Sequence, residues 1–311
     1  MRHRIFLALG AAAMLTGVVA EAKPGDRIRA KIAERMAAQS RAADANAPAF
    51  SPSETIAYGS DALQNLNFYK PQNASGPAPL VLFVHGGGWS KGSKDNGTGK
   101  WKAAHYPTAG YAFASINYRL VPQASVEQQA ADVASALKAL LMRADKLGID
   151  KRRVVIMGHS AGAHLVALVG SDERYLKGAG LSFADLAGVI PIDGAAYDVA
   201  AQMQDGNRMM QRSYKDAFGN EPARQRALSP TMQAAAPNAP RFLLLHVQRA
   251  DGVRQNEALE KALKAAGTAV ERQSIPGEGL MGHMEINRRL GDPDYVATGL
   301  VDGWLKPVFG G

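Results

Sequence analysis

The sequence has no cysteine among its 311 residues, and this absence excludes several kinds of protein chemistry. Disulfide cross-links, thiol nucleophiles and cysteine-bound metal sites all need a sulfur atom that the chain does not have. No other pattern in the sequence indicates a metal site or an organic cofactor. We therefore expect a protein that works with neither.

Long runs of like charge are also missing. The formal net charge is +8, but the densest basic run is only Lys151-Arg152-Arg153, which is typical of a solvated loop between a helix and a strand. Nucleic-acid-binding proteins usually gather such charges in one run or on one face. We expect no nucleic-acid partner, and we interpret the excess charge as an aid to solubility.

The sequence has one apolar run that is longer than a typical buried strand, and it lies at the N-terminus. Arg2 and Arg4 precede the apolar segment 5–20, which runs into Ala20-Glu21-Ala22. A basic start, an apolar middle and an Ala-x-Ala end predict a signal peptide, 1–22, cleaved after Ala22. An uncleaved membrane anchor is the alternative, but the run is below the roughly 20 residues that a span prefers. The sequence thus predicts a secreted or periplasmic protein with no stable membrane insertion after cleavage, which N-terminal sequencing of exported protein would check.

The remaining chain divides into an extension and one main domain. In residues 23–53, Ile28, Ile32 and Met36 recur every four positions among charged residues, which predicts a helical extension followed by a linker. In residues 54–311, apolar runs of strand length alternate with helical spacing. That alternation predicts an α/β fold with a mostly parallel sheet and helices on both faces. Periodicity weakens at about 195–240, where we expect a small cap-like insertion.

The pentapeptide Gly158-His159-Ser160-Ala161-Gly162 follows the apolar run 154–157 and precedes another apolar stretch, 163–169. A serine on so sharp a strand-to-helix turn takes strained backbone angles, and its hydroxyl stands clear of the sheet. The backbone N–H of Ala161 then faces the group that the serine attacks. The pattern predicts a nucleophile, and an ordinary turn is the alternative.

A second motif, His85-Gly86-Gly87-Gly88-Trp89, follows the apolar run 80–84. Consecutive glycines raise the entropy cost of folding, so they need a structural reason. A tight turn is one reason. The other is an oxyanion hole, in which the N–H groups of Gly87, Gly88 and Ala161 face a cavity, and one such donor contributes about 2.7–4 kcal/mol to transition-state stabilisation. The two motifs together favour catalysis.

These motifs resemble those of the α/β-hydrolase superfamily. More narrowly, the chain is similar to the hormone-sensitive-lipase-like branch and to carboxylesterases and arylformamidases, and Asn117-Tyr118-Arg119-Leu120 is similar to a stretch found there. The resemblance covers roughly 66–305. It implies an α/β-hydrolase fold and acyl transfer by a serine, a histidine and an acid.

Ser160 needs a base within hydrogen-bond reach. Of the histidines after residue 22, His283 alone stands in a glycine-rich loop after the last core strand, whereas His159 is expected to point away from the attack site. His246 is expected inside a strand and His105 in a loop before the serine. We therefore predict His283 as the base.

The acid is expected between serine and histidine, after a strand. Asp251 meets this condition and is our choice, with Asp193, one strand earlier than the family usually places the acid, as the rival. Glu278 is close to His283 in sequence but has no strand to hold it. By the resemblance, Ser160 is the nucleophile, Asp251 the acid and His283 the base.

The resulting expectation is a serine hydrolase that cleaves small or aryl carboxylic esters through an acyl-enzyme. Its partner is then a small-molecule ester, while the oligomeric state is not readable from the sequence. An arylformamidase-type amide hydrolase and a polysaccharide acetyl or feruloyl esterase are alternatives with the same chemistry. A secreted binding protein on a hydrolase fold is the alternative without catalysis.

Overall fold

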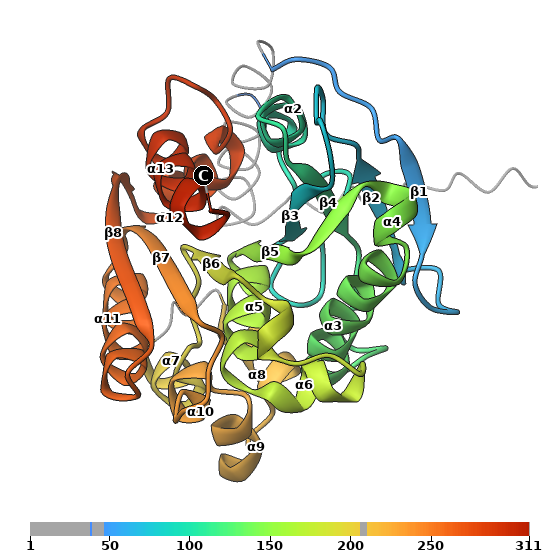
Figure 1. Cartoon of the computed structure of the whole chain (residues 1–311). Coiled ribbons are helices and arrows are strands. Elements are labelled where there is room, and N and C mark those ends of the chain that lie inside the picture. Colours follow the sequence, from blue (N-terminus) through green and yellow to red (C-terminus); the bar gives the residue numbers. More distant parts are fainter. Residues whose placement is uncertain (1–37, 39–46, 206–209, 311) are drawn as a thin grey trace, which may run out of the picture. The chain divides into compact units, whose positions relative to one another are not determined.

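A computed structural model describes residues 38, 47–205 and 210–310 of the chain (Figure 1). The chain divides into two compact units, Met1–Gln39 and Ser40–Gly311, and only the second is described further. The predicted signal peptide, 1–22, and most of the predicted extension, 23–53, lie outside the described residues and stay predictions. Among the described residues, no helix is long and apolar enough to span a membrane.

The main unit is built on an eight-stranded sheet with the order β1-β2-β4-β3-β5-β6-β7-β8. Strands β3 to β8 run parallel, while β2 is antiparallel to both of its neighbours, β1 and β4. The strands are β1 (Glu54–Ala57), β2 (Asn65–Tyr69), β3 (Ala78–Val84), β4 (Ala112–Ile116), β5 (Ile149–His159), β6 (Gly188–Ile192), β7 (Arg241–Gln248) and β8 (Ala269–Glu278). This is the mostly parallel sheet that the sequence predicts.

Helices cover both faces of the sheet (Figure 1). One face carries α2 (Lys100–Thr108), α12 (Gly279–Arg289) and α13 (Val296–Val308). The other carries α3 (Val126–Met142), α5 (Ala161–Ser171), α6 (Glu173–Gly178) and α11 (Ala250–Ala265), while the short α4 (Ala144–Leu147) precedes β5. A 3₁₀ turn, Phe183–Asp185, leads to β6.

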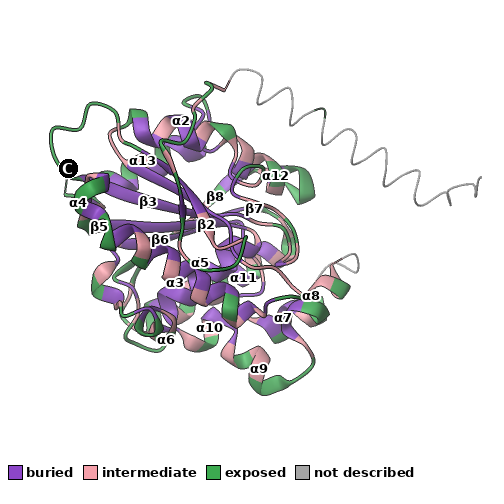
Figure 2. Cartoon of the chain, turned by 90° about the vertical axis from the view of Figure 1, so that its right-hand side faces the viewer, coloured by how far each residue is buried: buried purple, intermediate pink, exposed green. Residues whose placement is uncertain are grey.

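Each face of the sheet has its own hydrophobic core, because side chains alternate along a strand. In β3, Leu80, Leu82 and Val84 pack in the core under α3 and α5. Val81 and Phe83 pack in the core under α2, α12 and α13. All five are fully buried, which explains why the run is apolar at every position (Figure 2).

The expected insertion at about 195–240 contains four short helices: α7 (Val199–Asp205), α8 (Gln211–Phe218), α9 (Pro222–Ala227) and α10 (Pro230–Gln233). Tyr214 and Phe218 of α8 pack against Trp89 of the glycine loop. The insertion therefore contributes to the same core as the loop that follows β3.

Three local expectations are wrong. Lys151-Arg152-Arg153 belongs to β5 rather than to a loop, and His105 lies in α2. The segment expected as a glycine-rich loop before His283 is the end of β8 and the start of α12. His283 is thus held on a helix rather than on a loop.

Candidate active site

Ser160 occupies the turn between β5 and α5. Its backbone angles are φ 56° and ψ −117°, a conformation rarely taken by a residue with a side chain. The turn packs tightly against the end of β3, because a Cβ atom at Gly162 would lie 2.1 Å from the carbonyl oxygen of Val84. Two backbone hydrogen bonds hold Ser160 in this strained conformation. The Ser160 N–H donates to the carbonyl oxygen of Ile192, and the His164 N–H donates to the carbonyl oxygen of Ser160. The predicted sharp turn is therefore present.

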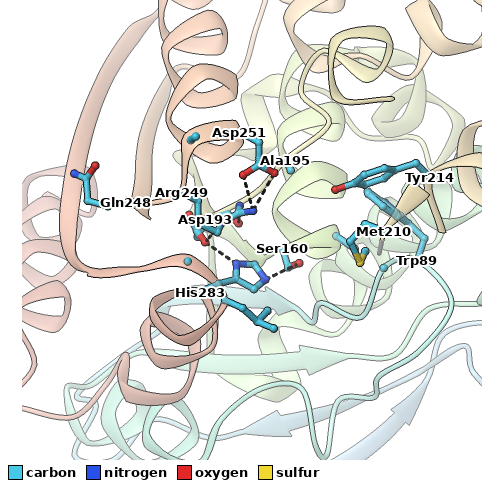
Figure 3. A pocket seen from close by; sticks show the side chains of 15 residues that line it. Trp89, Ser160, Asp193, Ala195, Met210, Tyr214, Gln248, Arg249, Asp251 and His283 are labelled. Carbon is cyan, nitrogen blue, oxygen red and sulfur yellow. Dashed lines mark hydrogen bonds and ion pairs between the residues drawn. The ribbon is translucent and has the colours of Figure 1, made fainter. Parts of the chain in front are cut away.

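Ser160, His283 and Asp193 form one chain of hydrogen bonds (Figure 3). Ser160 Oγ lies 3.1 Å from His283 Nε2, and His283 Nδ1 lies 2.5 Å from Asp193 Oδ2. When Nδ1–H donates to the carboxylate, Nε2 keeps its lone pair free to accept the serine proton. This is the arrangement of a nucleophile, its base and an acid that orients the base.

The choice of Asp251 as the partner of His283 is wrong, and Asp193, the rival, takes that place. β7 ends at Gln248 and α11 begins at Ala250, so Asp251 sits in the first helical turn and has no loop to carry it to His283. Its carboxylate instead accepts from Arg249 Nη1 at 3.2 Å and from Gln202 Nε2 at 3.0 Å. Asp193 directly follows β6, which pairs with β5, the strand just before Ser160, and its positive φ of 44° marks a sharp turn.

Asp193 is ionised in spite of its burial. Its side chain is fully buried, and burial by itself raises the pKa of a carboxyl group. The hydrogen bond and charge of His283, the charge of Arg249 and the N–H of Val247 outweigh burial and lower the pKa of Asp193 to about 2. The carboxylate is therefore available at neutral pH to fix the tautomer of His283.

His159, from the same pentapeptide as Ser160, supports His283. The two imidazole rings lie 4.5 Å apart, and His159 Nε2–H donates to the backbone oxygen of His283 at 2.9 Å. Burial, followed by the nearby His283, lowers the pKa of His159 well below its ordinary value, so this ring stays neutral. The pentapeptide sequence has no feature that would have revealed this contact.

The glycine loop after β3 is fixed by its own backbone. Gly87 has φ 127°, and a Cβ there would stand 2.1 Å from the carbonyl oxygen of Lys91, so no side chain fits. Tyr118 stacks on His85 at 4.4 Å and donates to its carbonyl oxygen, which ties the loop to the segment after β4.

Two of the three expected oxyanion donors line the cavity that contains Ser160. Gly88 and Ala161 line it together with Ser160, and Ala161 is the first residue of α5, whose N-terminus favours negative charge. Gly87 is not among the described residues that line the cavity, and its carbonyl oxygen accepts from Ser90 and Lys91. Its donor role stays a prediction.

The cavity has a volume of about 380 Å³. Trp89, Met210 and Tyr214 form an apolar side next to Ser160, while Arg249 and Asp251 lie on the opposite side (Figure 3). Met210 and Tyr214 come from the insertion, so the insertion shapes the space in which a substrate is held. The described residues contain no group of His, Asp or Glu side chains placed to hold a metal ion.

His164 joins the nucleophile helix to the glycine loop and the insertion. Trp89 Nε1–H donates to His164 Nδ1 at 3.3 Å, and His164 Nε2–H donates to the carbonyl oxygen of Leu228 at 2.8 Å. Only a neutral ring can make both bonds. Burial lowers the pKa of His164 to about 4, and burial likewise lowers the pKa of His85 to about 4.

These two histidines predict a loss of stability in mild acid. Their pKa is about 6.5 when the chain is unfolded and about 4 when it is folded, so the unfolded state binds more protons between these values. The stability that the two neutral histidines contribute to the folded state is fully present above pH 6.5 and is lost as the pH drops toward 4. We expect a loss of about 2 kcal/mol for each histidine at pH 5 relative to pH 7, measured by urea unfolding.

The control for this prediction is His164→Gln, which keeps an acceptor for Trp89 and a donor for Leu228 but does not titrate. The loss between pH 7 and pH 5 should be smaller in this variant by about 2 kcal/mol. An equal loss in the variant and the wild type would show that His164 is not responsible.

The strand order, the serine turn after β5 and the hydrogen-bonded Ser160, His283 and Asp193 together define an α/β-hydrolase fold. The chain belongs to the BD-FAE family, whose family model matches residues 66–263.

The chain is also similar to curated proteins of known name. A probable isoprenylcysteine α-carbonyl methylesterase of Arabidopsis thaliana is 35% identical over 120 residues, which cover 38% of this chain and 25% of that protein. The kynurenine formamidase of Danio rerio is 26% identical, and the match covers 79% of each chain. The chain matches only 25% to 30% of the length of several curated esterases.

Solved structures share the fold. Esterase B from Lactobacillus rhamnosis has a TM-score of 0.72 at 23% identity, and the match covers 91% of this chain and 94% of that one. At this level of identity the similarity shows the fold alone.

Proposed function

We propose that the protein is a serine esterase of the carboxylesterase type, which cleaves carboxylic esters through an acyl-enzyme. The observation that carries the proposal is the continuous hydrogen-bond chain from Ser160 Oγ through His283 to the ionised Asp193. Ser160 lies in the wall of a cavity that Gly88 and Ala161 also line. Relatives named as esterases support it further.

The reaction follows from the positions of the proton donors and acceptors. His283 Nε2 takes the proton of Ser160 as the serine oxygen attacks the ester carbonyl. The backbone N–H groups of Gly88 and Ala161 stabilise the negative charge that develops on the carbonyl oxygen. His283 then returns the proton to the leaving alcohol, and a water molecule, activated in the same way, releases the acid from Ser160.

The cavity supports small or aryl carboxylic esters as substrates. Its volume of about 380 Å³ is near the lower end of the range of roughly 300–1,000 Å³ for small-molecule sites. The side next to Ser160 is apolar because Trp89, Met210 and Tyr214 form it. An ethyl acetate hydrolase of Pseudomonas putida is 27% identical over 63% of this chain, which supports small esters.

Hydrolysis of an aryl formamide is the second candidate. The match to the kynurenine formamidase of Danio rerio extends over 79% of both chains, further than the matches to the methylesterases. The same serine, histidine and acid would attack a formyl carbonyl, with an aryl amine in place of the alcohol as the leaving group.

A substrate series separates the two candidates. We expect kcat/KM for p-nitrophenyl esters to be highest for acetate to butyrate and to fall toward octanoate, since the cavity is small. An aryl formamide and a feruloyl ester complete the series. A kcat/KM for the formamide above that for every ester would replace the esterase proposal by the second candidate, and no turnover of any member would contradict both.

Secretion or a periplasmic location is part of the proposal on the evidence of residues 1–22 alone. The proposal adds no cofactor and no metal to the reaction, since every step uses groups of the chain, the substrate and water.

A further inference from the structure

Arg249 is the residue between β7 and α11, and its guanidinium lies between two carboxylates (Figure 3). Nε donates to Asp193 Oδ2 at 3.0 Å, on the same oxygen that accepts from His283. Nη1 donates to both oxygens of Asp251 at 3.2 Å. Nη2 approaches the backbone oxygens of Asp193 and Gly194 at 3.3 and 3.4 Å.

These contacts are more than a surface ion pair. The Arg249 side chain is only 16% exposed, and those of Asp193 and Asp251 are 0% and 18% exposed. Burial alone would lower the pKa of the guanidinium, but the charges of Asp193 and Asp251 raise it, so Arg249 stays charged. Charge-assisted hydrogen bonds with little access to water are the strong ones.

The contacts extend from Arg249 into the insertion. Asp251 Oδ2 accepts from Gln202 Nε2 at 3.0 Å, and the same amide donates to Tyr214 Oη at 3.0 Å. Gln202 belongs to α7, and Tyr214 belongs to α8 and lines the cavity. A single polar network therefore runs from the cavity wall to the pair of Asp193 and His283.

We propose that Arg249 is a positioning residue that holds Asp193 toward His283, keeps Asp251 away from it, and balances the negative charges of both carboxylates. This inference rests on the proposed function for the role of His283 in turnover. Arg249 takes no part in proton transfer and acts only through Asp193.

The charges around His283 set the direction of the expected effects. Asp193 and His159 contact the imidazole, and Arg249 pairs with both Asp193 and Asp251. The buried Lys102 acts on the charge of His159. Of the tyrosines, Tyr197 and Tyr295 lie within electrostatic range of Asp193, and Tyr214 within that of Asp251. Removing the cation of Arg249 leaves the negative charges of Asp193 and Asp251 without their shared partner, which favours the protonated form of His283. Removing the charge of Asp251 leaves the cation unbalanced, which disfavours that form.

The test measures the titration of His283 in two ways. One is the acid limb of the pH dependence of kcat/KM, and the other is the NMR titration of the His283 ring in the resting enzyme, which needs no turnover. We expect Arg249→Met to move both upward by about one pH unit and Asp251→Asn to move both downward by a smaller amount. Arg249→Lys keeps the charge and should leave both nearly in place, while kcat falls roughly tenfold because the forked contacts are lost.

Arg254→Met is the matched control. Arg254 lies in α11, five residues after Arg249, is half exposed and pairs with Asp205 at 3.3 Å, so we expect no displacement of the titration. If Arg249→Met does not fold, the downward displacement in Asp251→Asn still decides the question.

Unchanged titration in Arg249→Met and Asp251→Asn, or displacement of both in the same direction, would overturn the inference and leave the proposed function intact. Failure of the esterase proposal would instead appear as absent turnover in the wild type, and the NMR titration would still test Arg249.

Discussion

Replacing Asp193 with asparagine is expected to lower kcat by about 10⁴-fold, the loss that follows when a base of this type is no longer held in its productive tautomer. An asparagine keeps the shape of the side chain but can present its amide nitrogen to His283 Nδ1, which then loses its acceptor. Asp193 is fully buried and its pKa is about 2, so the charge that the substitution removes is present throughout the working range.

The matched comparison is Asp251→Asn, which removes the same charge at the residue that the sequence favoured as the acid. Asp251 contacts Arg249 and Gln202 rather than His283, so we expect kcat at its optimal pH to fall by less than roughly tenfold. Both variants are assayed with p-nitrophenyl acetate, with urea unfolding to verify that they fold. A larger loss in Asp251→Asn than in Asp193→Asn would overturn the assignment of the acid.

Replacing Ser160 with alanine has the largest expected effect, a loss of about 10⁶-fold in kcat, as for serine hydrolases that lose their nucleophile. The substitution removes the only atom that the proposed mechanism bonds to substrate, while the turn itself stays intact because an alanine tolerates the same backbone as a serine. KM should change little, because the cavity wall is otherwise unaltered. Residual activity within tenfold of the wild type would place the reaction at another residue.

A neighbouring serine provides the control for that experiment. Ser213 in α8 lies close to Gly88, so it is a second hydroxyl near the same cavity. It has no hydrogen bond to a histidine among the described residues, and Ser213→Ala should retain most of the activity. The contrast between the two serines separates loss of the nucleophile from general disturbance of the site.

The sequence was sufficient to predict the sheet and the serine turn, because both depend on local patterns. Val154 to Met157 read as a buried strand, and the glycines on either side of Ser160 are needed where Gly162 meets the carbonyl of Val84. The strands β3, β6 and β7 were equally readable, since they are apolar at nearly every position. Such strands have the same pattern in any parallel sheet covered on both faces.

The acid was not predictable in the same way, because its identity depends on which carboxylate reaches His283 in three dimensions. Asp193 and Asp251 both follow a strand in the sequence. Asp251 is captured in the first turn of α11, beside Arg249, and the length of the connection between β7 and α11 was not readable. The first turn of α12, from Gly279 to Gly282, was also not readable, because the glycines at 277 and 279 read as a loop.

Labelling with a fluorophosphonate tests the central claim most directly, because this reagent bonds preferentially to a serine that a nearby base activates. In the wild type, mass spectrometry of the digested protein should find one adduct, on the peptide that contains Ser160. The adduct should be absent from Ser160→Ala and unchanged in Ser213→Ala. An unlabelled wild type, or an adduct that persists in Ser160→Ala, would contradict the assignment of Ser160 as the nucleophile.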